Sequence, residues 1–393
     1  MKKIKLIIMF LPLFLITGCY NYRELNELAI TSAVGIDKTD DGYRATIQVM
    51  NTQKNGADSN SSTEQPKFVT YTADGDNLQE TLRSIILDSS KRIYANHIQI
   101  LVIGSELAED GIYDILDMFF RNSESRKQFP VLIAKDCKAE EILNIITPLE
   151  TLNSKNIRDG LSVDSKYLGV GEVVSYEELV GTYLDSNKEI VLPTVELKGS
   201  LDTGEDVSNI AESDPETRVV TSALAIFKDD KLLGFLDKKE SIALSFIRNK
   251  INNTVLSYEC SNDSYVVGEV INTKTKLEMQ KDPLKAKIAI QANLNINEVT
   301  CDLDLEDPEV ISEIEDNLEN ELKGNIDDTL KHIIEEYNTD VFGFRDSLYK
   351  NYPKYYKEIE DDWYDLIFQD LDIDIEVNFR FVEKGNALKV IKR

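Results

Sequence analysis

Histidine, cysteine and tryptophan are scarce in this sequence of 393 residues, which has two histidines, four cysteines and one tryptophan. The zinc-protease motif H-E-x-x-H needs two histidines one helical turn apart, whereas His97 and His332 are far apart in the chain. The sequence also has no G-x-S-x-G elbow, Walker A loop or G-x-G-x-x-G fingerprint. We therefore expect a protein that is not an enzyme and needs no cofactor or metal ion, although 71 acidic residues leave a glycosidase pair open.

Positive charge is also in short supply. Lysine and arginine number 44 against 71 aspartates and glutamates, so the formal net charge is −27 at pH 7. Such a surface repels nucleic acid and anionic lipid headgroups, and we expect no nucleic-acid partner. After residue 16 no apolar run approaches the roughly 18 residues that a transmembrane helix needs. Contact with a membrane is therefore expected to come from a lipid and from protein partners, not from a basic patch.

The one long apolar run lies at the N-terminus. Three lysines precede the apolar residues 4–16, which is the layout of an export signal that is too short to span a membrane. The sequence LITG then leads to Cys19, and small residues before a cysteine at this point are what a lipoprotein signal peptidase requires. The alternative is an ordinary secreted protein with an incidental Cys19. We predict that residues 1–18 are a signal peptide and that Cys19 carries lipid chains, in which each buried methylene contributes about 0.8 kcal/mol.

Three further cysteines follow Cys19, namely Cys137, Cys260 and Cys301. Their odd number and wide spacing do not make a disulfide framework, and at most one bridge could form. The sequence favours small buried thiols as their role.

Residues 19–197 are predicted to form an N-terminal α/β region, either as one domain or as two subdomains. Apolar runs at 31–37 and 43–50, joined by KTDDG, predict a β-hairpin. The same turn fits a calcium loop only in part, because Gln48 stands where the loop needs a bidentate glutamate. A polar stretch at 51–66 predicts a flexible loop. Periodicity predicts strands at 68–73, 93–103 and 130–134 and helices at 77–89, 106–120 and 139–145.

Residues 198–218 are polar and acidic, and we predict a linker there between the two main domains. The C-terminal α/β domain, residues 219–393, follows. Its first helix, 237–251, begins with Asp237 and Glu240 at the spacing of a capping box. Strands are predicted at 219–227, 231–235, 265–279, 286–296 and 371–381.

The longest predicted helix spans residues 307–337. Asp307 suits the N-cap, Pro308 the first helical position and Glu309 the first turn. Isoleucine and leucine recur along it at helical spacing, which favours a core-facing stripe over a groove for a partner. The predicted fold class is therefore α+β or mixed α/β, multi-domain, with packed helices on mixed sheets and a long amphipathic helix in the C-terminal domain.

Two features have competing interpretations. The aromatic segment at 341–381 favours a helix pair that packs its rings on a sheet, because an acidic chain argues against stacking on nucleic acid; a sugar-stacking site stays open. His97 lies in an apolar, β-rich run. It is interpreted as a hydrogen-bonded core or sheet-edge residue in preference to a catalyst.

Several blocks of the sequence resemble the Ger(x)C spore germination lipoproteins. The resemblance begins at Cys19, although family members usually have Trp-Asp after this cysteine and here Tyr20 and Asn21 follow it. This departure affects the surroundings of the lipid-bearing cysteine more than it affects membership of the family. The matching blocks are residues 18–29, 33–37, 91–104 with His97, 147–150, 191–193, 225–236, 307–310 and 340–344, followed by Tyr349, Tyr352, Pro353, Trp363 and Phe368.

The resemblance implies a non-enzymatic C subunit of a nutrient germinant receptor. It implies tethering through Cys19 to the outer face of the spore inner membrane, beside integral-membrane A and B subunits. A second hypothesis is a solute-binding lipoprotein that feeds a transporter, since such proteins are also lipid-anchored and of similar length. An anchored cell-envelope hydrolase is the third, and the sequence offers no titratable site for it.

Overall fold

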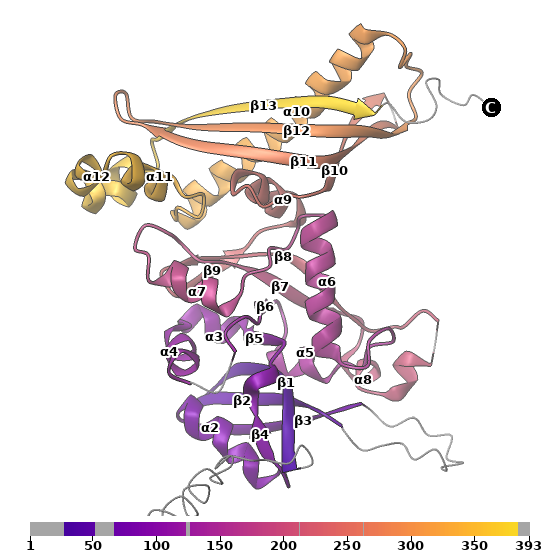
Figure 1. Ribbon diagram of the computed structural model, residues 1–393, viewed down its shortest axis with the longest axis vertical. Helices are drawn as coiled ribbons and strands as arrows, with labels where there is room; N and C mark the ends of the chain where they lie inside the picture. Colours follow the sequence, from indigo (N-terminus) through magenta and orange to yellow (C-terminus); the bar gives the residue numbers. More distant parts are fainter. Residues whose placement is uncertain (1–26, 52–66, 123–125, 212, 262, 384–393) are drawn as a thin grey trace, which may run out of the picture.

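The computed structural model describes residues 27–51, 67–122, 126–211, 213–261 and 263–383. The predicted signal peptide, Cys19 and nearly all of the predicted loop at 51–66 lie outside these residues. Two sheets organise the described chain, the larger in its N-terminal part and the smaller in its C-terminal part (Figure 1). The mixed sheets and packed helices confirm the predicted fold class.

The larger sheet has nine strands within the described residues, in the order β3-β2-β1-β5-β6-β7-β8-β9, with β4 pairing β1. The central strands β1, β5, β6 and β7 run parallel to one another, and the outer pairs are antiparallel. The strands are β1 (Leu28–Thr39), β2 (Gly42–Met50), β3 (Phe68–Gly75), β4 (Arg92–Tyr94), β5 (Ile100–Gly104), β6 (Val131–Ala134), β7 (Val191–Lys198), β8 (Arg218–Lys228) and β9 (Lys231–Phe235). The predicted hairpin β1/β2 is confirmed, and the strands predicted at 219–227 and 231–235 are present as β8 and β9, which form a second hairpin.

Helices cover both faces of this sheet. One face packs against α2 (Leu78–Ser84), α3 (Ser105–Asp110), α4 (Tyr113–Arg121) and α7 (Tyr176–Tyr183). The other face packs against α5 (Ala139–Asn144) and α6 (Asn153–Tyr167). Buried parallel strands need apolar side chains on both faces, which explains the fully buried run Ile100–Gly104.

The single helix predicted at 106–120 is wrong, because the chain forms α3 and α4 with a break between them. Gly111 has φ +129°, a backbone conformation that L side chains rarely adopt. The break lets the N–H of Ile112 donate to the carbonyl of Asp230, and the N–H of Tyr113 to its carboxylate at 3.1 Å. The β8/β9 turn thus replaces the helical hydrogen bonds that are lost at the break.

The predicted linker at 198–218 connects β7 to β8, which are antiparallel neighbours in one sheet. It contains α8 (Leu201–Gly204) and the 3₁₀ turn η5 (Val207–Ile210). Strands β8 and β9 therefore complete the sheet of the N-terminal half. The division of the chain at this segment stays a prediction.

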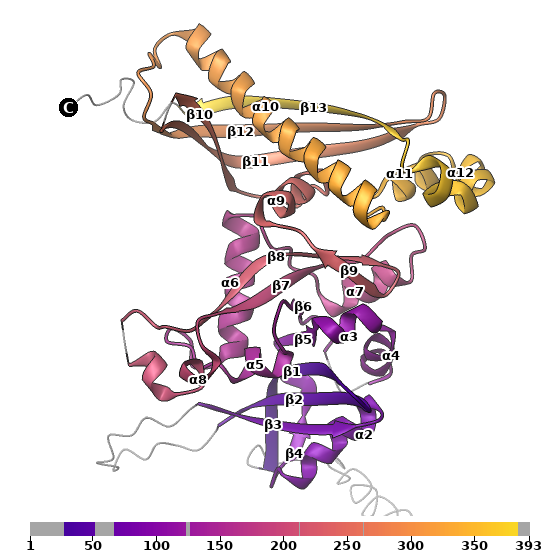
Figure 2. The same ribbon diagram turned by 180° about the vertical axis from the view of Figure 1, so that it is seen from behind.

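The smaller sheet has the order β10-β11-β12-β13, with antiparallel pairs except for the parallel pair β12/β13. Its strands are β10 (Thr254–Ser261), β11 (Ser264–Gln280), β12 (Lys285–Val299) and β13 (Asp372–Glu383). Its helices are α9 (Lys238–Ile247), α10 (Pro308–His332), α11 (Phe344–Asn351) and α12 (Pro353–Ile359), with η6 (Ile333–Tyr337) directly after α10. Figure 2 shows α10 crossing one face of this sheet.

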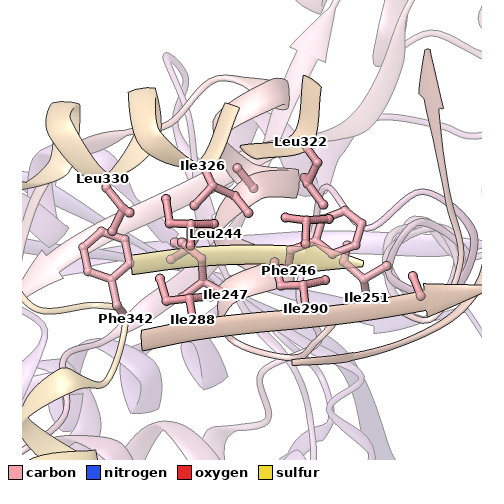
Figure 3. Packing of buried hydrophobic residues seen from close by; sticks show 14 of the residues in the cluster. Leu244, Phe246, Ile247, Ile251, Ile288, Ile290, Leu322, Ile326, Leu330 and Phe342 are labelled. Carbon is pink, nitrogen blue, oxygen red and sulfur yellow. The ribbon is translucent and has the colours of Figure 1, made fainter. Parts of the chain in front are cut away.

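Helix α10 and the short helix α9 bury the core of the C-terminal part (Figure 3). The apolar stripe of α10 is buried, including Leu322, Ile326 and Leu330, which confirms the predicted core-facing surface. The capping box predicted at Asp237 and Glu240 is also present at the start of α9. Because α9 contacts both β8 and β11, it packs between the two sheets.

The outer edge of β13 is covered by acids of α10. The backbone N–H of Phe379 donates to Glu319 at 2.6 Å, and that of Phe381 donates to Glu315 at 2.8 Å. An open edge strand is a template for pairing with another chain, so these carboxylates protect it.

The prediction that Cys260 and Cys301 are small buried thiols is wrong, since the two form a disulfide. Strands β10 and β12 both run antiparallel to β11, so they end at the same end of the sheet. There the Cα atoms of Cys260 and Cys301 lie 6.5 Å apart. Cys137 is a free, half-buried cysteine.

Replacing Ile326 by alanine tests the α10 core. Ile326 is fully buried, so we expect Ile326→Ala to lower the free energy of unfolding by about 2–5 kcal/mol through lost contacts and a residual cavity. Urea denaturation followed by fluorescence measures this directly, because Trp363 is the only tryptophan and is fully buried in the same core. The exposed Lys323→Ala on the same helix is the control, and equal effects of the two variants would contradict this packing.

Candidate functional site

A polar junction lies where the C-terminal helices meet strands β8 and β9 of the larger sheet. The segment between η6 and α11 runs across the end of β8. Thr339 donates a hydrogen bond to the carbonyl of Phe227 at 3.0 Å, and Lys228 donates to the carbonyl of Asn338 at 3.2 Å. These contacts join residues more than a hundred positions apart, so the junction is a purely tertiary feature.

Asp340 organises the turn into α11. Its carboxylate accepts hydrogen bonds from the backbone N–H groups of Gly343, Phe344 and Arg345, at 3.0, 3.1 and 2.6 Å. Gly343 has φ +96°, which the turn requires. Burial raises the pKa of Asp340, while the three N–H groups and the Arg345 charge act in the opposite direction. A carboxylate that would be costly to bury is thus satisfied by the helix start itself.

Glu189, just before β7, accepts hydrogen bonds from side chains of the C-terminal part. The Arg345 guanidinium and the Tyr364 hydroxyl both donate to its Oε1 at 2.5 Å, and the N–H of Asp229 donates to its Oε2 at 2.9 Å. The guanidinium also lies 4.7 Å from the centre of the Tyr364 ring, and the Lys228 amine lies 4.4 Å from it. Both members of the Glu189–Arg345 pair are largely buried, with side chains 4% and 11% exposed.

Glu172 forms a second buried contact between the N-terminal and the C-terminal part of the molecule. Its side chain is 4% exposed and pairs with Arg248 at 3.2 Å and with Lys250 at 2.6 Å. Arg248 also donates to the carbonyl of Val341 at 2.8 Å, which links this contact to the Asp340 turn. Burial alone would raise the pKa of Glu172, but the two cations outweigh it and hold the pKa of that carboxyl below its usual range.

A cavity of about 340 Å³ opens beside Glu172. Charged residues of both signs line it, among them Glu178, Lys188, Arg248 and Lys250. The described residues contain no group of three histidine, cysteine, aspartate or glutamate side chains placed to hold a metal ion. The buried charges of Glu172 and Glu189 are used to join the two sheets.

The residues singled out from sequence lie apart from this junction. Cys19 lies outside the described residues. His97 is exposed in the 3₁₀ turn η4 (Ala95–His97) directly after β4, with its ring 5.9 Å from that of Tyr94. Of the two places expected for it, the core is therefore wrong. His332 on α10 contacts Glu240 on α9 at 2.5 Å.

Asp37, which fitted a calcium loop in part, has a structural contact instead. Its carboxylate accepts hydrogen bonds from the backbone N–H groups of Ala139 and Glu140, at 2.7 and 3.0 Å. Asp37 therefore satisfies two backbone N–H groups at the start of α5. The hairpin predicted for this stretch is confirmed.

Sequence reasoning missed the central pair of the junction. Glu189 and Arg345 are 156 residues apart, and no local pattern connects them. The one available signal was Asp340 followed by Gly343 before an aromatic helix, which is compatible with a capped helix start. The predicted helix pair in the aromatic segment is confirmed as α11 and α12, with Phe344, Trp363 and Phe368 fully buried nearby.

Comparison with known proteins covers nearly the whole chain. Residues 21–197 match the spore germination protein N-terminal domain, and residues 222–385 match the spore germination B3/GerAC-like C-terminal domain. The chain belongs to the GerAC-like family of spore germination proteins. This is a family of germinant receptor subunits of the GerC type, and it is not known as an enzyme family.

Individual relatives agree with this assignment to the GerAC-like family. Spore germination protein KC of Bacillus subtilis (strain 168) is 28% identical over 378 residues, covering 94% of this chain and 93% of the relative. Spore germination protein B3 of the same organism is 21% identical over 401 residues, covering 98% and 99% of the two chains. The crystal structure of the GerBC protein matches with a TM-score of 0.53 and 18% identity over 89% of this chain and 96% of that one, which shows a shared fold.

The junction contains several of the blocks on which the resemblance to this GerAC-like family rests. Residues 340–344 form the Asp340 turn, residues 225–236 include β9 and the end of β8, and Trp363 and Phe368 pack behind the turn. Of the helices in the described chain, none combines the length and apolar composition that a membrane crossing requires.

Removing the Arg345 charge tests the junction. We expect Arg345→Met to lower the free energy of unfolding by about 3–5 kcal/mol, because it leaves Glu189 buried without its cation. Trp363 fluorescence during urea denaturation reports the change. Lys350→Met is the matched control on the same helix, since Lys350 is 64% exposed in its pair with Asp346 and should cost at most about 1 kcal/mol. Similar losses in both variants would contradict a special role for Arg345.

Glu172→Gln tests the second contact through pH. A carboxyl whose folded pKa is lowered contributes stability above its ordinary pKa of 4.5 and loses it as pH falls through the folded value. The free energy of unfolding of the variant should therefore be about 1–3 kcal/mol lower than that of the wild type at pH 7. This gap between the two free energies should narrow below pH 4.5. Urea denaturation across this range measures the gap. The exposed Glu177→Gln should show almost none, and a gap for Glu172→Gln that is independent of pH would refute the ionic contribution.

Proposed function

We propose that this protein is a lipid-anchored, non-enzymatic subunit of a nutrient germinant receptor and is needed for germinant-triggered spore germination. It would be tethered through Cys19 to the outer face of the spore inner membrane and would work beside integral-membrane A and B subunits. The observation that carries the proposal is the match to the GerAC-like family over residues 21–197 and 222–385. The order of lysines, an apolar run and Cys19 before the matched region supports the anchor.

Lipid attachment suits a protein with this charge. Removal of residues 1–18 takes away three lysines and no acid, so the formal net charge of the mature chain is −30. Two acyl chains hold a protein on a bilayer where one chain gives only marginal binding, and they do so without a general attraction of the body to the membrane. The anchor then confines the protein to a plane, which raises its effective concentration near membrane partners.

The buried charges of the described chain support a binding role. Asp340, Glu189, Arg345 and Glu172 are titratable groups of the kind that active sites use, but all four are engaged in structural contacts. Glu189, Arg345 and Glu172 join the two sheets, and Asp340 holds the turn that carries Arg345. A stiff connection between the sheets keeps surfaces on both of them in a constant relative position. Such a body is suited to contacting more than one partner subunit.

The competing hypothesis of a solute-binding lipoprotein expects two α/β lobes that close on a ligand. Here the larger sheet is one continuous unit, and the smaller sheet has a different topology with its long helix on one face. The comparisons favour the receptor hypothesis over the transporter hypothesis, because the matched families are named for spore germination.

Cys19→Ala tests the anchor and the partnership together. Without the thiol no lipid can attach, so we expect most of the variant to leave spore membranes in a wash at high salt, and germination with nutrient to fail. From detergent extracts of wild-type membranes, the protein should co-purify with two polytopic membrane proteins, identified by mass spectrometry.

Cys137→Ala is the control, because it also removes a free cysteine but leaves the proposed anchor intact. Full membrane retention of Cys19→Ala would refute the anchoring mechanism. Co-purification with transporter components in place of two receptor subunits would favour the solute-binding hypothesis.

A further inference from the structure

A cavity of about 610 Å³ opens on the N-terminal part, between strands β1 and β2, helices α2 and α4, and strand β4. Its walls are mainly apolar, with Val34, Ile47, Ile93, Ile98 and Phe119 among them. Three arginines also line it, Arg83 of α2, Arg92 of β4 and Arg121 of α4, and no carboxylate does. In a chain with 71 acids and 44 bases, a cavity whose charged lining residues are all cations is unusual.

Exposed apolar side chains stand next to this cavity. Leu87 is 89% exposed and Ile86 is 45% exposed in η3 (Ile85–Leu87), directly after α2. Phe120 at the end of α4 is 56% exposed, and the amine of Lys127 lies 4.5 Å from the centre of its ring. We call Arg83, Arg92, Arg121, Ile86, Leu87 and Phe120 together the arginine face.

Some acids share these elements. Asp117 pairs with Arg121 at 2.7 Å, and Glu80 and Asp88 are exposed. Among the residues that the structure describes, Arg83 has no carboxylate partner. Asp114 on α4 is a further acid, so the elements themselves carry both signs of charge. The positive charge is concentrated in the cavity, whose lining contains the three arginines and no acid.

The position of this face brings it close to the proposed anchor. The described chain enters the sheet at Leu28, which pairs with Arg92 of β4 at the start of β1. Leu28 lies nine positions after Cys19, and a chain of that length reaches at most about 30 Å. Figure 1 places α2 and β4 at the end of the molecule opposite the C-terminal sheet. A lipid on Cys19 would thus hold this end, and not the other, next to the bilayer.

We propose that the arginine face lies on the membrane surface and binds anionic phospholipids. The position of the arginine face next to the bilayer depends on the anchoring through Cys19 proposed above. Its suitability for anionic phospholipids does not depend on that anchor. The Arg83 guanidinium contacts a lipid phosphate, which it can bind with two parallel hydrogen bonds, and the positive charges of Arg92 and Arg121 beside it add to the attraction. Leu87, Ile86 and Phe120 enter the interface between headgroups and acyl chains, where exposed apolar side chains lose water contact.

The charge of the remaining surface makes this contact directional. A body with a net charge of −30 is repelled from an anionic bilayer in most orientations, so approach is favourable only with the arginine face forward. The anchor then sets the distance and the arginine face sets the orientation. An acidic segment of a partner protein is the other ligand with matching charge, and the test below distinguishes it.

The test uses the mature chain carrying Cys19→Ala, which binds vesicles only through its protein surface. We expect it to co-sediment at low ionic strength with vesicles of phosphatidylglycerol and phosphatidylcholine, and not with vesicles of phosphatidylcholine alone. Adding Arg83→Gln and Arg121→Gln should weaken binding roughly fivefold for each arginine removed. Leu87→Ser should also weaken it severalfold, and added salt should release the protein.

Matched controls come from elsewhere on the chain. Arg158→Gln with Arg380→Gln makes the same change in net charge on α6 and β13, and Arg158 is paired with a neighbouring aspartate as Arg121 is. Leu149→Ser alters a leucine that is also 89% exposed. These variants should bind as the parent does.

Three outcomes would overturn the proposal: no binding to anionic vesicles, equal binding to neutral ones, or equal losses in the control variants. The first would make an acidic protein segment the better ligand for this face. Because every protein in this test lacks Cys19, a negative result would leave the anchoring mechanism standing, and the membrane-retention experiment decides that separately.

Discussion

Glu189 and Arg345 come from different parts of the molecule and are buried where those parts meet. Removing two charges from water is costly, and the cost is offset only while the pair and its hydrogen bonds are intact. Any shift of the C-terminal sheet against the larger sheet would separate the Glu189 carboxylate from both the Arg345 guanidinium and the Tyr364 hydroxyl. The pair therefore favours one relative position of the two sheets over all others, beyond what the apolar contacts of α9 provide.

Local signals predicted the local structure well. The hairpin turns, the capping box of α9 and the Asp307–Pro308 start of α10 were all readable, because each depends on residues within one or two turns of the chain. Apolar periodicity likewise identified the buried stripe of α10. The break at Gly111 was missed because its cause is Asp230, which is 117 residues away from the Tyr113 N–H that it binds.

The contacts of the candidate site could not be predicted from the sequence either, because they join residues that are far apart in the chain. The Cys260–Cys301 bridge, the Glu172 contacts and the Glu189–Arg345 pair all depend on which strands become neighbours. The polar segment at 198–218 joins two adjacent strands of the larger sheet, a pairing that composition alone does not reveal. The functional inference came instead from the order of many short blocks along the chain, which the family matches support.

Strand β13 also has a consequence for the order in which the chain can assemble. It pairs with β12, although residues 300–371, which contain α10 and the aromatic helices, lie between the two strands in the chain. Until residues 372–383 have been synthesised, α10 lacks one of the strands that it packs on, and β12 has an open edge. A chain interrupted before this point would display both, so proteases and chaperones could recognise it as unfinished.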